Sequence, residues 1–199
     1  MTAAEDNRKR SPMLRVVVVV SIVCIAIVGL TFAIKSARQQ AHLHAQRQQA
    51  ERRQKSFDLV KRGSTRASVM DSKLLPMLAN DPDCRRRVTN VDFFMSDIDP
   101  ADAPSVSKLK NVTSMTFYCT NGTKELLLAA RSLPIDDLQF EMPDLLPEDF
   151  LILKEFPQLK KVRIEHMMED EWIARLESEL PNVVVEAPYP RSKEPGMAR

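Results

Sequence analysis

Clustered acidic side chains are the residues of this chain whose types could most readily support catalysis. Glu148-Asp149 and Glu169-Asp170-Glu171 could supply a general acid and a general base. Each cluster, however, begins a stretch with helical apolar spacing, and the helix dipole favours acidic residues in that position. The two clusters therefore indicate helix starts rather than an acid–base pair.

The histidines offer little for metal or nucleophile chemistry. His42 and His44 are two residues apart and would face different sides of a helix, while His166 has no nucleophile near it in sequence. The chain also has no glycine-rich phosphate loop and no Cys-x-x-Cys pair. We therefore expect no catalytic residues, no cofactor and no metal.

Three cysteines raise the question of a disulfide. Cys24 lies in an apolar run, where it serves as a small apolar side chain. Cys84 and Cys119 leave two alternatives open. They could be separate buried thiols, or they could form a disulfide if this part of the chain lies outside the cytoplasm.

Binding is a better-supported expectation than chemistry, because polar and aromatic residues alternate with apolar ones in four short stretches. Alternate residues of a strand point to opposite faces, so the apolar positions face a core and the others face outward. The outward residues are Asn90, Asp92, Phe94, Ser114, Thr116, Tyr118, Asp137, Gln139, Glu141, Lys161, Arg163 and Glu165. From these we predict a partner-binding surface of Asp92, Phe94, Thr116, Tyr118, Gln139, Glu141, Arg163 and Glu165.

Two aromatic residues make this surface a candidate contact patch for a partner. If the stretches align, Phe94 and Tyr118 are neighbours in a row that continues with acidic residues. Aromatic side chains are favoured at interface cores. The alternative is a solvated sheet face whose aromatics are covered by loops.

A repeat positions these stretches. The pattern apolar-x-x-apolar-x-apolar starts at residues 88, 112, 135 and 159, and a fifth copy begins at 183. Between the copies lie helix-like stretches with apolar faces, formed by Val106, Leu109, Leu127, Ala130, Leu133, Phe150, Leu153, Phe156, Ile173, Leu176 and Leu180. A strand plus a helix of this size cannot bury its faces alone, but stacked units share one core.

The segment Phe156-Pro-Gln-Leu-Lys-Lys-Val-Arg-Ile164 resembles one part of a leucine-rich repeat. In that family, the corresponding residues lead into the strand on the concave side. The resemblance covers residues 84–187 and implies a short α/β solenoid of about four repeats, with parallel strands, convex helices and a protein-binding role. The family's buried Asn or Cys would fall at Ser96, Thr120, Pro143 and Met167, and none of these matches. The alternative is an open α/β domain with a parallel sheet.

The run from Val16 to Ile34 contains no charged residue and is long enough to cross a bilayer as a helix. Its length fits an uncleaved signal anchor better than a removed signal peptide. A short basic tail, residues 1–15, precedes it. We expect a single-pass membrane protein with a cytoplasmic N-terminus and an extracytoplasmic C-terminal domain.

The remaining segments complete the predicted organisation. Residues 35–63 form a polar helical stalk that leaves room for weak self-association. Residues 64–87 form a helical cap, with a helix over Arg66–Asn80 that either kinks or divides into two short pieces at Pro76. The repeat domain occupies residues 88–187, and residues 188–199 form a disordered tail.

Charge narrows the class of partner. Residues 1–64 carry 12 Lys/Arg and 4 Asp/Glu, while residues 65–199 carry 17 and 23. An acidic C-terminal half argues against nucleic acid, which requires a positive face. We predict a membrane-anchored protein-interaction module. The alternative is a structural or assembly subunit of a membrane complex, in which the span and the stalk make the main contacts.

Overall fold

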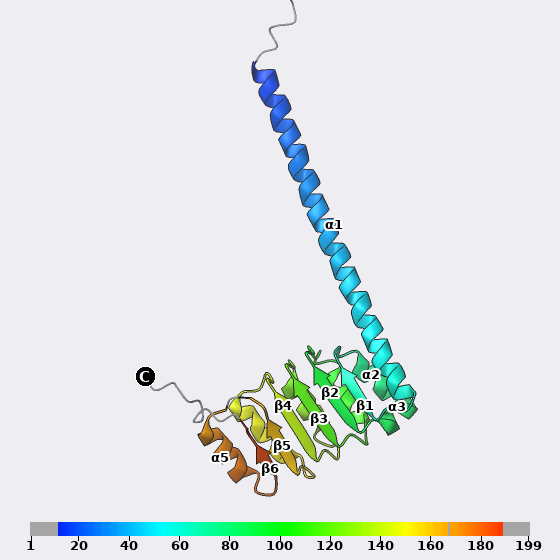
Figure 1. Ribbon diagram of the computed structural model, residues 1–199, viewed down its shortest axis with the longest axis vertical. Coiled ribbons are helices and arrows are strands. Elements are labelled where there is room, and N and C mark those ends of the chain that lie inside the picture. The colour runs from blue at the N-terminus through cyan, green and yellow to red at the C-terminus, as the bar shows by residue number, and fades with distance from the viewer. Residues whose placement is uncertain (1–11, 167, 189–199) are drawn as a thin grey trace, which may run out of the picture. The chain divides into compact units, whose positions relative to one another are not determined.

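The computed structural model describes residues 12–166 and 168–188, with side chains described from residue 30 onward. The chain divides into two compact units, residues 1–48 and 49–199. Helix α1 (Pro12–Lys61) accounts for all the described backbone of the first unit and contributes its last residues to the second (Figure 1). The helix predicted for the stalk is therefore confirmed.

Several expectations concern residues that the structure does not describe. Residues 16–29 of the predicted span Val16–Ile34 are in α1, but their side chains fall outside the described set, as do residues 1–11 and 189–199. Among the residues whose side chains are described, no helix has both the length and the apolar character needed to cross a bilayer.

The second unit, here called the sheet domain, is an α/β domain with a six-stranded, all-parallel sheet, so the predicted class is confirmed. The strands lie side by side in chain order (Figure 1). They are β1 (Arg66–Val69), β2 (Asn90–Phe94), β3 (Ser114–Tyr118), β4 (Asp137–Glu141), β5 (Lys161–Ile164) and β6 (Val184–Glu186). The helices are α2 (Leu74–Asn80), α3 (Pro82–Arg87), η1 (Ala103–Lys108), α4 (Thr123–Ala130), η2 (Pro147–Glu155) and α5 (Asp170–Glu179).

The strand register confirms the alignment expected from the repeat. Val91 pairs in register with Met115, which pairs with Leu138, and Asp137 lies opposite Lys161. The inward strand residues predicted from the pattern are buried, and the helical faces pack against them. Two of the expected helices, η1 and η2, are 3₁₀ helices.

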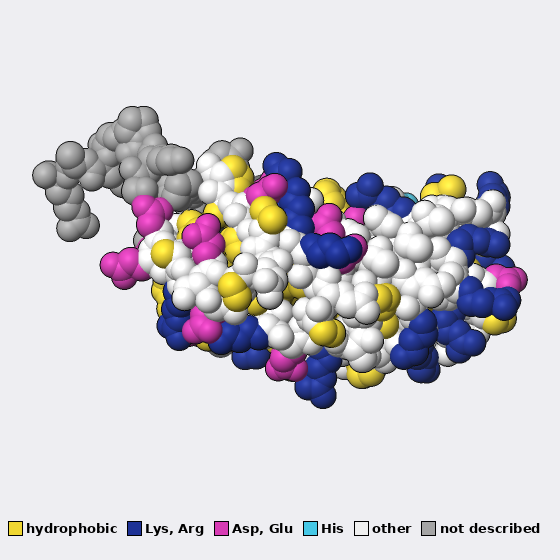
Figure 2. Space-filling model, turned by 90° about the horizontal axis from the view of Figure 1, so that it is seen from below, with side chains coloured by type: hydrophobic (Ala, Val, Ile, Leu, Met, Phe, Trp, Pro, Cys, Tyr) yellow, Lys and Arg dark blue, Asp and Glu magenta, His cyan; other side chains and the backbone are white. Residues whose placement is uncertain are grey.

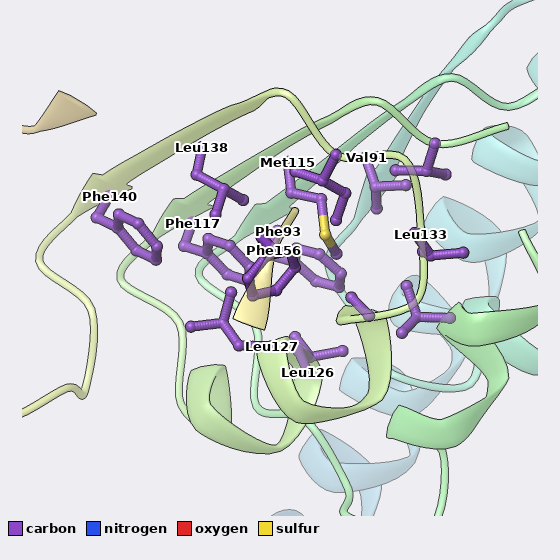
Figure 3. Close-up of a cluster of buried hydrophobic side chains, with 14 of the residues drawn as sticks. Val91, Phe93, Met115, Phe117, Leu126, Leu127, Leu133, Leu138, Phe140 and Phe156 are labelled. Carbon is purple, nitrogen blue, oxygen red and sulfur yellow. The ribbon is translucent and has the colours of Figure 1, made fainter. Parts of the chain in front are cut away.

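A stack of phenylalanines runs through the core at right angles to the strands. The rings of Phe93 and Phe117 lie 5.1 Å apart and those of Phe117 and Phe140 5.2 Å apart, each pair tilted by 6°. Phe150 of η2 closes the stack edge-on against Phe140. Leu126 and Leu127 of α4 cover the stack from the helical side (Figure 3). One inward position in each of three successive strands thus builds a continuous column.

The helix predicted over Arg66–Asn80 is wrong at its start, because Arg66–Val69 is the first strand of the sheet. Ala67 and Val69 lie in register with Val91 and Phe93, which places another copy of the repeat 24 residues before the first one recognised. Pro76 lies in the first turn of the helix α2, where a missing N–H costs no hydrogen bond within the helix.

The boundary drawn between stalk and cap at residue 63 is also wrong. The end of α1 belongs to the sheet domain: Val60 is fully buried, and Phe57 packs against the core. Ser56 Oγ donates a hydrogen bond of 2.8 Å to the carbonyl of Ser68 in β1. The last turns of α1 therefore cover the outer edge of the first strand, which would otherwise be open to pairing.

Hydroxyl groups occupy two of the positions where a buried Asn or Cys was sought. Ser96 and Thr120 are almost fully buried. The Ser96 hydroxyl lies 3.5 Å from the Thr120 hydroxyl, which is 3.2 Å from the carbonyls of both Phe93 and Tyr118. A short hydroxyl ladder therefore supports the chain after β2 and β3. Met167, at the corresponding place after β5, lies outside the described residues.

Candidate functional site

Two aromatic rings stack on each other on the outward sheet face. Phe94 at the end of β2 and Tyr118 at the end of β3 have ring centroids 4.6 Å apart and planes 7° apart. Phe94 is 40% exposed, and Tyr118 is partly exposed. The loops therefore leave both rings accessible, and the adjacency predicted from the repeat is confirmed.

A shallow groove of about 470 Å³ surrounds this aromatic pair. We call it the aromatic groove, and its lining residues are Arg66, Ser68, Met70, Asp92, Phe93, Phe94, Thr116, Tyr118 and Glu141. Five of the eight predicted partner-binding residues, Asp92, Phe94, Thr116, Tyr118 and Glu141, are among them.

The remaining three predicted residues are in a separate polar group on β4 and at the end of β5. Gln139 Nε2 donates to Glu165 Oε1 at 3.2 Å, and Arg163 Nε lies 2.6 Å from the same oxygen. Glu165 is thus already paired twice within the chain. This group is less free to bind a partner than the aromatic groove.

Asp92 is also held in an ion pair. Its carboxylate accepts two hydrogen bonds from the Arg66 guanidinium, one of them from Nη2 at 2.9 Å. The hydrogen bond to Asp92 raises the pKa of Arg66 above its ordinary value. The ion pair of Arg66 and Asp92 therefore forms a charged side of the aromatic groove.

A second groove, of about 540 Å³, adjoins the first and was not foreseen from the sequence. We call it the α1 groove, and its lining residues are Gln49, Arg52, Arg53, Lys55, Ser56, Leu59, Ser68, Met70, Asp71, Leu74, Phe94 and Met95. Ser68, Met70 and Phe94 line both grooves. The spacing of 24 residues between Met70 and Phe94 was the signal that could have placed Met70 on the outward face.

The carboxylate clusters considered for catalysis have structural roles. Asp149 Oδ2 accepts a hydrogen bond from the Leu146 N–H at the start of η2, and its Oδ1 lies 2.6 Å from Lys124 Nζ. The hydrogen bond from Lys124 lowers the pKa of Asp149. Glu169, Asp170 and Glu171 stand at the start of α5, as their helix-start interpretation requires. Among the described residues, no three His, Cys, Asp or Glu side chains gather as metal ligands would.

The disulfide considered between Cys84 and Cys119 is not formed, and both thiols are free. Cys84 lies in α3, before β2 begins, whereas Cys119 directly follows the end of β3. Because the strands are parallel, the two residues lie at opposite ends of the sheet, about 15 Å apart along strands of this length. A disulfide requires Cα atoms within about 7 Å.

Cysteine alkylation tests this arrangement. Burial, followed by the hydrogen bond to Asp81, raises the pKa of the Cys84 thiol to about 11, so about one part in a thousand is thiolate at pH 8. We expect iodoacetamide to modify the partly exposed Cys119 in the native, unreduced chain at pH 8. Cys84 should react only after unfolding, as followed by peptide mass spectrometry. A Cys84–Cys119 linked peptide would contradict the structure.

Comparison with known proteins gives no assignment for this site: no protein-family model matches the chain, and no curated protein matches it in sequence.

Proposed function

We propose that the protein is a membrane-anchored interaction module in which a leucine-rich-repeat-like solenoid presents the aromatic groove to a protein partner. The repeat assignment is supported by strands that follow one another in chain order at intervals of 23 or 24 residues. An open α/β domain of the doubly wound kind would reverse its strand order at a switch point. In such a repeat the ladder of Ser96 and Thr120 takes the place of the family's buried Asn.

The single observation that carries the proposed function is the stacked pair of Phe94 and Tyr118 in an accessible groove. Solvent contact with apolar ring surface is unfavourable, by about 25 cal/mol for each Å² left uncovered. Covering the pair with a partner recovers that free energy, and aromatic residues in pockets frequently dominate binding. The neighbouring charges of Arg66, Asp92 and Glu141 supply a polar rim.

Replacement of the Tyr118 side chain tests the function. We expect Tyr118→Ala to keep the fold, because its outward ring contributes to no part of the buried core. It should reduce co-purification of specific proteins with the full chain at least tenfold, as measured by quantitative mass spectrometry. Leu128→Ala is the matched control, since Leu128 is 41% exposed on α4, away from both grooves.

Two results would overturn this function. One is an unchanged set of co-purified proteins in Tyr118→Ala, and the other is equal loss in Leu128→Ala. Replacing residues 16–34 with an unrelated apolar span separates the proposal from the alternative role as an assembly subunit. An interaction module still binds its partner after this replacement, whereas a subunit that assembles through its span no longer does.

A further inference from the structure

We infer that the α1 groove holds an acidic, amphipathic helix of a partner protein. The inference builds on the proposed interaction function and adds the chemical class of what is bound. It stands on three properties of the groove: an apolar floor, a basic wall, and a strand edge that is already closed.

Large apolar side chains form the floor of the groove and stay exposed to solvent. Leu59 is 59% exposed, Met70 43% and Met95 68%, and Phe94 also lines the groove. Methionine side chains are flexible and polarisable, so they adapt to apolar partners of different shapes. The floor therefore suits a segment with several large apolar side chains on one face.

The wall is basic and carries charges that are free to pair. Arg53 forms a 2.7 Å ion pair with Asp71, the only acidic residue in the groove lining as the described residues form it. In the described part of the chain, no ion pair involves Arg52 or Lys55. These two residues are three apart on α1 and so lie on the same side of the helix.

The basic character extends beyond the groove. Lys and Arg side chains gather at the end of the sheet domain that carries α2 and α3 (Figure 2). A field of this sign attracts acidic segments and disfavours basic ones. The complementary occupant therefore carries Asp or Glu beside its apolar residues.

The outer edge of β1 is already closed, which favours a helix over a strand as the occupant. A partner strand could pair with β1 only along its outer edge, and the hydrogen bond from Ser56 Oγ to the Ser68 carbonyl occupies that edge. Recognition must then use side chains rather than backbone pairing. A helix with apolar residues at positions i, i+3, i+4 and i+7 provides them along one face, and it can pack along the α1 residues that line the groove.

Two designed peptides test the inference with the full chain in phosphatidylcholine nanodiscs. Both carry Leu at i, i+3, i+4 and i+7, and the flanking positions are Glu in one and Lys in the other. By fluorescence anisotropy, we expect the Glu peptide to bind at least tenfold more tightly than the Lys peptide. The double variant Arg52→Glu/Lys55→Glu should reverse this preference.

A matched pair of variants tests the floor. Met95→Asp should weaken binding of the Glu peptide at least tenfold. The fold should tolerate this change, because Met95 is exposed and has a φ of 46°, which Asp adopts more readily than most residues. Leu128→Asp introduces the same charge on α4 and should leave binding unchanged, with circular dichroism as the check on folding of both variants.

Equal binding of the two peptides, or binding of neither, would overturn the inference. Self-association of the chain that Met95→Asp abolishes would also overturn it, because the groove would then belong to a second copy. Tyr118 lies outside the α1 groove, so the two proposals fail separately. If Tyr118→Ala loses its partners while the Glu peptide does not bind, only the present inference is rejected. Peptide binding without any effect of Tyr118→Ala rejects only the aromatic-groove function.

Discussion

Phe117→Ala is expected to destabilise the sheet domain by about 3–5 kcal/mol, the usual cost of removing a fully buried phenylalanine ring. Phe117 stands in the middle of the inward stack and contacts Phe93 on one side and Phe140 on the other. Small domains are stable by only about 5–15 kcal/mol, so a large part of the stability would be lost. Thermal unfolding followed by circular dichroism should show a midpoint lowered by on the order of 10 °C.

Phe94→Ala is the matched control for this measurement. Phe94 also stacks on an aromatic residue of β3, but on the outward face and with 40% of its surface exposed. Its loss should cost about 0.5–1.5 kcal/mol, the range for one aromatic pair. Equal effects of the two substitutions would contradict the assignment of the core to the inward face.

Thr120→Val should destabilise the domain by about 1–3 kcal/mol through loss of the hydroxyl ladder alone. Valine has nearly the same shape as threonine, so packing in this buried position changes little. The substitution removes the hydroxyl that reaches the carbonyls of Phe93 and Tyr118, and it leaves the buried Ser96 hydroxyl without its neighbour. Urea unfolding gives the change in the free energy of unfolding.

A double-mutant cycle with Ser96→Ala shows whether the two hydroxyls act together. If they are coupled, the double variant should cost at least about 0.5 kcal/mol less than the sum of the single variants. Additive costs would mean that Ser96 and Thr120 support their loops independently, and the 3.5 Å contact between them would then carry no energy.

The repeat made most of the sheet domain predictable from sequence. An inward-facing strand residue must be apolar in every repeat, so Val91, Met115 and Leu138 follow a fixed spacing that is visible in the order of the amino acids. The same spacing correctly placed Phe94 beside Tyr118. Prediction succeeded where the same kind of side chain is required at the same position of each repeat.

The first repeat was missed because its inward residues satisfy that requirement weakly. Ser64 stands where the later repeats begin with Val or another apolar residue, and Ala67 is small. The apolar residues from Leu74 onward form a real helix, and the helical interpretation was extended too far back, across β1.

The α1 groove could not be predicted, because it depends on contacts between segments far apart in sequence. Residues 49–59 have the composition of a solvated helix, and Phe57, Leu59 and the nearby Val60 are the large apolar residues of this region. That this helix covers β1 is a property of the folded domain. The hydroxyl ladder was missed because asparagine or cysteine was sought at these positions. The hydroxyls of Ser96 and Thr120 form buried contacts there instead.

The closed edge at β1 has a consequence for how the chain can change in length. New copies of the 24-residue unit cannot be added before β1 without displacing α1 from its place. Because each inner strand pairs only with its two neighbours, an extra copy can be accommodated between inner strands, such as β4 and β5, without new long-range contacts. Duplication there would lengthen the sheet and leave both grooves intact, because their residues lie on β1 to β4, in the adjoining segments and at the end of α1. The part of the domain that carries the grooves is therefore separate from the part that can be extended.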